Sequence, residues 1–198
     1  MIDTKTVAAV CALTVLSACG GATTSTDGGF GGGGSRLSYG DIADIAADVN
    51  AGYRATAITP KALVPTTGAA TYAGAVGGTI ADTTVGGVMQ ADVNFTTNRI
   101  GGLMGNFVTE GGSDLDGTLV LRNGVLNRTS NSQQVAIFAD VDGVLTSEAN
   151  QSIVVDARLR NSGFKGNDVR FIGGDIEGIA TIDGVDTVID MRTQLERP

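Results

Sequence analysis

The sequence predicts an all-β protein: an eight-stranded antiparallel up-and-down barrel, preceded by a short N-terminal helix and a flexible tether. Three observations support this prediction: the composition, the alternation of apolar and polar residues after Pro65, and the turn signals between the alternating runs. The 198 residues include 30 Gly, three Pro, no Trp and no His. Gly supplies the positive φ angles of tight turns, and β-branched residues favour strands. The length suits one domain with a hydrophobic core.

The N-terminus is typical of a bacterial lipoprotein. Lys5 precedes an apolar run at residues 6–16, which is too short for a transmembrane helix but suits a signal peptide. The following segment, Leu16-Ser17-Ala18-Cys19-Gly20, resembles a lipobox. That resemblance implies that residues 1–18 are the signal peptide and that Cys19 carries a diacylglycerol, which makes the membrane a partner through the lipid. An ordinary secretory signal that contains a cysteine is the alternative.

The lipobox has consequences for location and for disulfides. Gly20 is not the Asp that retains lipoproteins in the inner membrane of many Gram-negative bacteria, so we expect an outer-membrane anchor, with the domain facing the periplasm or the cell surface. Cys11 leaves with the signal peptide and Cys19 is acylated, so we expect no disulfide. Residues 19–36 read as a Gly-rich flexible tether with a reach of roughly 20–25 Å.

Residues 37–65 predict a short helix followed by an extended linker. Ser38 is suited to cap the helix, and Pro60 and Pro65 interrupt the chain after it. The apolar residues of this segment recur at helical spacing, namely Ile42, Ile45, Ala46 and Val49.

Residues 66–198 form the predicted barrel domain, because apolar and polar residues alternate there with the period of a strand. We expect strands at roughly 68–76, 86–95, 99–108, 116–123, 133–141, 151–160, 168–175 and 178–191. A hairpin about Asp183-Gly184 is the alternative for the last strand. The turn signals are Thr97-Asn98, Gly111-Gly112-Ser113, Asn123-Gly124, Asp142-Gly143, Asn161-Ser162-Gly163 and Asp183-Gly184.

Closure of these strands into a barrel follows from their short connections. Such connections make neighbouring strands antiparallel, and closure removes exposed edges. A transmembrane barrel has an apolar outer face and aromatic girdles. Three Tyr, six Phe and no Trp leave few residues for girdles, so we expect a soluble barrel with an apolar interior.

Three segments resemble the barrel domain of transferrin-binding-protein-B-like lipoproteins. They are GAATYAG at 68–74, GVMQADVNF at 87–95 and IGGLMGNF at 100–107. In that family a G-x-A-x-Y-x-G strand leads to A-D-x-x-F and then to I/V-x-G-x-I-x-N-F. The resemblance implies an eight-stranded barrel on an outer-membrane or surface lipoprotein that binds other proteins. The family's closing A-x-E-x-x-G-x-F segment is replaced by FIGG and DIEG at 171–178, and a single barrel does not imply transferrin binding.

Composition and motifs argue against enzymatic chemistry, so we expect no catalytic residues, no cofactor and no metal. The absence of His excludes Ser-His-Asp, Cys-His and ordinary zinc sites. The net charge of −8 repels phosphate backbones, so we expect no nucleic-acid partner. Carboxylate pairs in glycosidases act as acid and base, but we interpret the pairs here as turn or strand-end residues. These pairs are Asp114 with Asp116, Asp140 with Asp142, and Asp183 with Asp186.

Residues 140–151 begin like a calcium loop but carry Val144 and Leu145 where an oxygen ligand and a Gly belong, so that motif fails. A looser calcium site among turn carboxylates remains an alternative. Six aromatic residues either fill the barrel or line a ligand cavity, and we favour packing. They are Tyr72, Phe95, Phe107, Phe138, Phe164 and Phe171.

The function that these observations favour is a monomeric surface lipoprotein whose barrel binds a protein partner through its loops. A lipocalin-like carrier of a small apolar ligand and a structural envelope lipoprotein are the alternatives.

Overall fold

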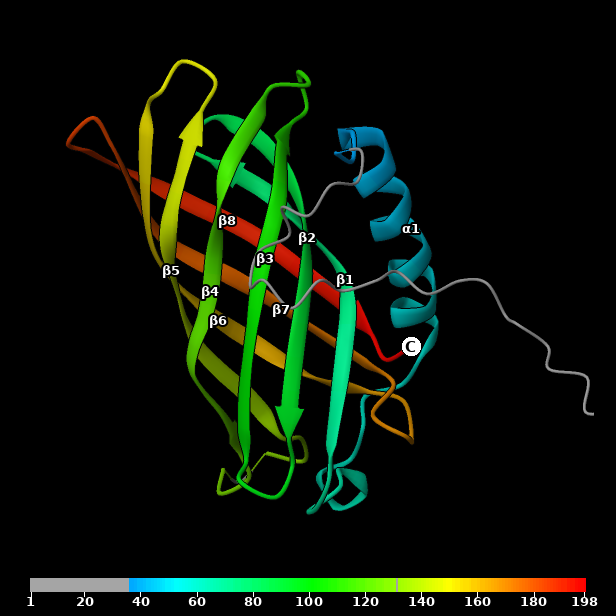
Figure 1. Cartoon of the computed structure of the whole chain (residues 1–198). Helices are drawn as coiled ribbons and strands as arrows, with labels where there is room; N and C mark the ends of the chain where they lie inside the picture. Colours follow the sequence, from blue (N-terminus) through cyan, green and yellow to red (C-terminus); the bar gives the residue numbers. More distant parts are fainter. Residues whose placement is uncertain (1–35, 131) are drawn as a thin grey trace, which may run out of the picture.

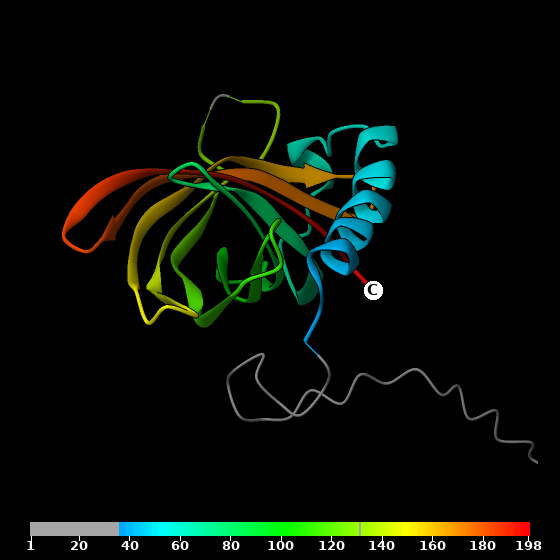
Figure 2. The same ribbon diagram turned by 90° about the horizontal axis from the view of Figure 1, so that it is seen from above.

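The computed structural model describes residues 36–130 and 132–198, and it shows a closed antiparallel barrel with one α-helix against its outer wall (Figures 1 and 2). Each strand pairs with the next along the chain, and β1 pairs with β8 to close the barrel. The predicted fold class is therefore confirmed. The elements are α1 (Tyr39–Ala55), the 3₁₀ turn η1 (Lys61–Leu63), β1 (Ala69–Ile80), β2 (Thr83–Asn94), β3 (Arg99–Thr109), β4 (Asp114–Asn127), β5 (Ala136–Ser147), β6 (Ser152–Lys165), β7 (Phe171–Ile182) and β8 (Val185–Glu196).

Seven of the strands are longer than the sequence predicts, and the last one was misplaced. The alternative hairpin is the correct one, because β7 and β8 meet at the two-residue turn Asp183-Gly184. Asp183 has a φ of 52° and Gly184 a φ of 80°, which is the pair of positive angles that such a hairpin turn requires.

Three of the six predicted turns lie inside strands. Asn123-Gly124 falls in β4, Asp142-Gly143 in β5 and Asn161-Ser162-Gly163 in β6. At Asn123 and Asn161 the register shifts by a β-bulge, and their φ angles are 52° and 48°. These two bulges place an Asn at the same positive φ that a hairpin turn uses, so the sequence signal is shared between the two.

The barrel interior is a continuous hydrophobic cluster with contributions from all eight strands. Tyr72, Phe95, Phe107 and Phe164 belong to it, and the Phe164 ring lies 6.3 Å from that of Tyr72 and 5.9 Å from that of Phe95. The Tyr72 hydroxyl donates a hydrogen bond to the Val169 carbonyl at 2.7 Å, and burial raises its pKa. Packing is therefore the role of these four aromatic residues.

The other two predicted interior aromatics lie elsewhere. Phe171 is buried on the outer wall beneath α1, where its ring meets Tyr53 edge-on at 6.5 Å. Phe138 is on the outer wall and 44% exposed. At Phe138 a bulge between Ile137 and Ala139 shifts the alternation. At Phe171 both faces of the strand are buried, because Ile172 points into the core and Phe171 lies under α1, so the period of two does not decide which face is inside.

The linker between α1 and β1 is tied to the barrel. The Thr59 hydroxyl donates to the Gly166 carbonyl at 2.5 Å, and the Arg128 guanidinium donates to the carbonyls of Val64 and Pro65. The linker also contains η1, so it is not extended throughout as the sequence predicted.

Candidate binding groove between the helix and the barrel wall

The start of α1 is fixed by a capping box. Ser38 Oγ accepts a hydrogen bond from the Asp41 backbone N–H at 3.2 Å, and the Ser38 backbone N–H donates to the Asp41 carboxylate at 2.9 Å. These bonds satisfy amide groups that the first turn leaves without helical partners. The hydrogen bonds from Ser38 favour the charged carboxylate and lower the pKa of Asp41. The cap predicted at Ser38 is confirmed.

A small apolar cluster holds α1 on the barrel. Ile42 from the helix is 3% exposed and packs with Ala75 of β1 and Val108 of β3. Glycines on the wall allow the close approach: a Cβ at Gly86 would lie 3.2 Å from Ile42 Cγ2, and one at Gly173 would lie 2.5 Å from Tyr53 Cζ. The close packing of the predicted helix on the barrel wall therefore depends on glycines in the strands.

Polar contacts secure both ends of the helix segment. Before α1, the Arg36 guanidinium lies 2.9 Å from the Asp114 carboxylate and 2.5 Å from that of Asp116. The hydrogen bond to Asp116 contributes most to raising the pKa of Arg36, and the bond to Asp114 raises it further. At the other end, Lys165 Nζ lies 4.0 Å from the Tyr53 ring centroid and donates to the Tyr53 carbonyl at 2.9 Å. A cation near the last carbonyls of a helix also complements its dipole.

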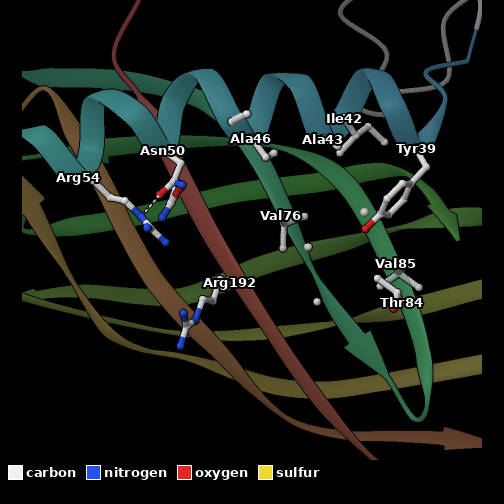
Figure 3. Close-up of a pocket in the computed structure, with 16 residues that line it drawn as sticks. Tyr39, Ile42, Ala43, Ala46, Asn50, Arg54, Val76, Thr84, Val85 and Arg192 are labelled. Atoms are coloured by element: carbon white, nitrogen blue, oxygen red, sulfur yellow. Dashed lines mark hydrogen bonds between the residues drawn. The ribbon is translucent and has the colours of Figure 1, made fainter. Parts of the chain in front are cut away.

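A groove of about 440 Å³ runs between α1 and the barrel wall (Figure 3). Three glycines, Gly77, Gly78 and Gly86, contribute backbone to the strand side of the groove. The apolar side chains along it are small or branched, and they are Ile42, Ala43, Ala46, Ala47, Ala75, Val76 and Val85.

The polar groups of the groove are gathered mainly towards the C-terminal end of α1. Figure 3 shows Arg54 and Arg192 at that end and Tyr39 at the other. Arg54 Nε donates to Asn50 Oδ1 at 3.0 Å, and Arg192 Nε lies 3.2 Å from Asp175 Oδ1. Guanidinium groups bind carboxylates with two parallel hydrogen bonds. The groove is therefore an apolar channel with two guanidinium groups at one end, one of which already pairs with Asp175.

The predicted carboxylate pairs form separate contacts outside this groove. Asp140 and Asp142 lie within β5 and not at a turn, so that part of the interpretation is wrong. Arginines on neighbouring strands explain them: Asp140 lies 3.5 Å from Arg158 and Asp142 lies 3.3 Å from Arg122. Asp183 accepts from Gln151 at 2.6 Å, and Asp186 accepts from Thr181 at 2.7 Å. Within residues 36–130 and 132–198, no three His, Cys, Asp or Glu side chains are grouped to hold a metal ion.

Cys19, the predicted signal peptide and most of the predicted tether lie outside the described residues. The groove was not predicted from the sequence. Its apolar helix residues appear in the sequence as ordinary core residues, and the glycines opposite them appear as turn or strand glycines. The helical spacing shows that α1 has an apolar face, but the sequence alone does not show how much of that face the wall leaves open.

In the parts of the chain that the structure describes, no helix is long and apolar enough to cross a membrane. Comparisons with protein-family models, with characterised proteins and with solved structures gave no match.

Proposed function

We propose that this protein is an outer-membrane lipoprotein, anchored through Cys19, whose barrel is a non-enzymatic binding module for a protein partner. The lipobox-like segment at 16–20 and the resemblance of residues 68–107 to transferrin-binding-protein-B-like barrels support the proposal. The observation that carries the binding role is the groove between α1 and the barrel wall.

The groove is a better binding surface than the loops that the sequence suggested. Six of the seven connections between consecutive strands contain two to five residues, and the exception is 128–135. Turns of this length present little surface, whereas the groove is concave and largely apolar. The interior is filled by the side chains of the core cluster, which favours a partner on the outside over an apolar ligand carried inside.

The chemistry of the groove favours a short apolar peptide segment that ends in, or carries, a carboxylate. The small side chains that line the groove leave room beside α1 for apolar side chains of the partner. Arg54 and Arg192 then bind the carboxylate at one end. A peptide cannot add a strand here, because β1 and β2 are already paired on both sides.

The anchoring part of the proposal is tested by labelling cells with a palmitate analogue. We expect label on the wild type and none on Cys19→Ala, because the thiol is the acceptor of the diacylglycerol. Label on both proteins, or on neither, contradicts a Cys19 anchor. Protease treatment of intact cells then decides the side: cleavage of the domain indicates the cell surface, and protection indicates the periplasm.

The groove is tested by photo-crosslinking in cells. Benzoylphenylalanine at Ala47 lies in the groove, whereas the same residue at Asp48, also on α1 and exposed, lies outside it and on a different face of the helix. We expect a protein adduct of one mass from Ala47 and little or none from Asp48. Equal adducts from both positions, or none from Ala47, contradict the proposed binding site.

A further inference from the structure

A second depression lies on the barrel wall over β4, β5 and β6, on a different side from α1, which packs mainly against β1, β2, β7 and β8. Its volume is about 370 Å³. We call it the wall pocket and define it by six of its lining residues, which are Asn123, Phe138, Asp140, Arg158, Arg160 and Asn161. The proposed protein-binding groove does not involve any of them.

Three irregularities in strand pairing meet at the wall pocket. The register shifts between Arg122 and Val125 in β4, between Ile137 and Ala139 in β5, and between Arg160 and Gly163 in β6. Asn123 and Asn161 hold left-handed φ angles at two of these shifts. Bulges redirect side chains and are common beside functional sites. Left-handed φ angles at residues other than Gly persist where the surrounding structure fixes them.

Phe138 lies at the β5 shift and is unusually exposed. Its exposed fraction is 44%, whereas the other four phenylalanines among the described residues are at most 3% exposed. A single exposed apolar residue is ordinary on a protein surface. Phe138 differs because it lines a depression together with the polar side chains of Asn123, Asp140 and Arg158.

The polar side chains of the wall pocket are held by one another. Asn123 Nδ2 donates to Asp140 Oδ2 at 3.0 Å, and Arg158 Nε lies 3.5 Å from the other oxygen of Asp140. Across the pocket, Asn161 Nδ2 donates to Asp175 Oδ2 at 3.1 Å. Amide, carboxylate and guanidinium groups therefore offer both donors and acceptors around one aromatic ring.

This combination suits a hydroxyl-rich ligand without a positive charge. Asp140 and Arg158 pair with each other, which leaves one net positive charge from the exposed Arg160, and that charge opposes a cation. Each hydroxyl of a sugar both donates and accepts hydrogen bonds, as such a site requires. The C–H face of a pyranose ring is attracted to the negative face of an aromatic ring.

We propose that the wall pocket binds a short neutral saccharide, with Phe138 as the stacking platform and Asp140, Arg158 and the two asparagines as hydroxyl partners. The volume lies near the lower end of the range for small-molecule sites. The ligand is a carbohydrate of the protein's surroundings and is independent of the peptide proposed for the groove.

The proposal is tested by titrating the full-length chain, purified in detergent, with maltotetraose, cellotetraose and chitotetraose, using calorimetry and saturation-transfer NMR. We expect saturable binding of at least one of them. Phe138→Ala and Phe138→Leu then weaken it by at least about tenfold, while Phe138→Tyr retains it. The Leu variant separates stacking on a ring from simple apolar contact.

The matched control is Val144→Ala, because Val144 lies on the same strand and is 48% exposed. We expect it to bind as the wild type does, and thermal unfolding confirms that each variant is folded. Absence of saturable binding by all three saccharides overturns the proposal. Undiminished binding by Phe138→Leu, or equal loss in Val144→Ala, overturns it as well.

Discussion

At the scale of single residues, glycines determine how closely the strands and the helix approach. A Cβ added at Gly102 of β3 would lie 2.4 Å from the Gln90 carbonyl oxygen, and one at Gly124 of β4 would lie 2.1 Å from that of Ile100. Such positions cannot accept a side chain unless the backbone moves. The sequence shows many glycines but does not distinguish those required by close approach from those required by turns, because the difference depends on the partner strand.

Gly101 and Gly102 provide a direct test of this view. We expect Gly102→Ala to lower the free energy of unfolding by about 1–3 kcal/mol, because the new methyl group overlaps the Gln90 carbonyl oxygen. Gly101→Ala is the matched control, since its Cβ would lie 3.7 Å from the Leu121 carbonyl oxygen, an ordinary contact. Denaturant unfolding measures both variants, and equal stability of the two would contradict the role assigned to Gly102.

Residue chemistry also explains which predictions of the site were correct. Ser38 caps α1 as predicted, because an N-cap is a local interaction over four residues. The ion pairs of Asp140 and Asp142 were not predicted, because their partners Arg158 and Arg122 become neighbours through strand pairing alone.

At the scale of elements, period-two alternation located the strands but not all of their ends. Asn123-Gly124 and Asn161-Ser162-Gly163 were interpreted as turns because Asn and Gly tolerate positive φ, and the structure uses them as bulges within long strands. The true ends are set by pairing along the whole barrel: β4 and β6 each extend over 14 residues.

The helix α1 is held by a cluster of its own, separate from the barrel core. We therefore expect Ile42→Ala to release α1 while the barrel stays folded, with a loss of about 2 kcal/mol or more in the stability of the docked helix. Hydrogen–deuterium exchange measures this as faster exchange at residues 39–55 and unchanged exchange in β4–β6.

Ile179→Ala is the control for this substitution. It is the same Ile-to-Ala change, but Ile179 lies on β7 with 48% of its surface exposed, so the change leaves the contact between α1 and the barrel intact. We expect its exchange in α1 to match that of the wild type. Faster exchange throughout the barrel in Ile42→Ala would show instead that helix and barrel unfold as one unit.

At the scale of the whole molecule, the barrel positions two concave sites on different sides of its wall. One lies beside α1 and is apolar with two arginines, and the other lies over β4–β6 and combines an aromatic ring with polar groups. The fold class followed from composition, alternation and turn residues, which are properties of the chain. Neither site was predicted from the sequence, because each brings together residues from elements that become neighbours only when the barrel closes or the helix docks.

The groove beside α1 is proposed to bind a protein partner through an apolar channel and a pair of arginines. The measurement that tests this binding mode is the affinity of the partner recovered by crosslinking at Ala47 for the double variant Arg54→Gln, Arg192→Gln. The control is Arg99→Gln, Arg122→Gln, which removes the same charge from β3 and β4. We expect a loss of at least about tenfold in affinity for the first variant and little change for the second. Equal affinities for the two double variants would contradict it.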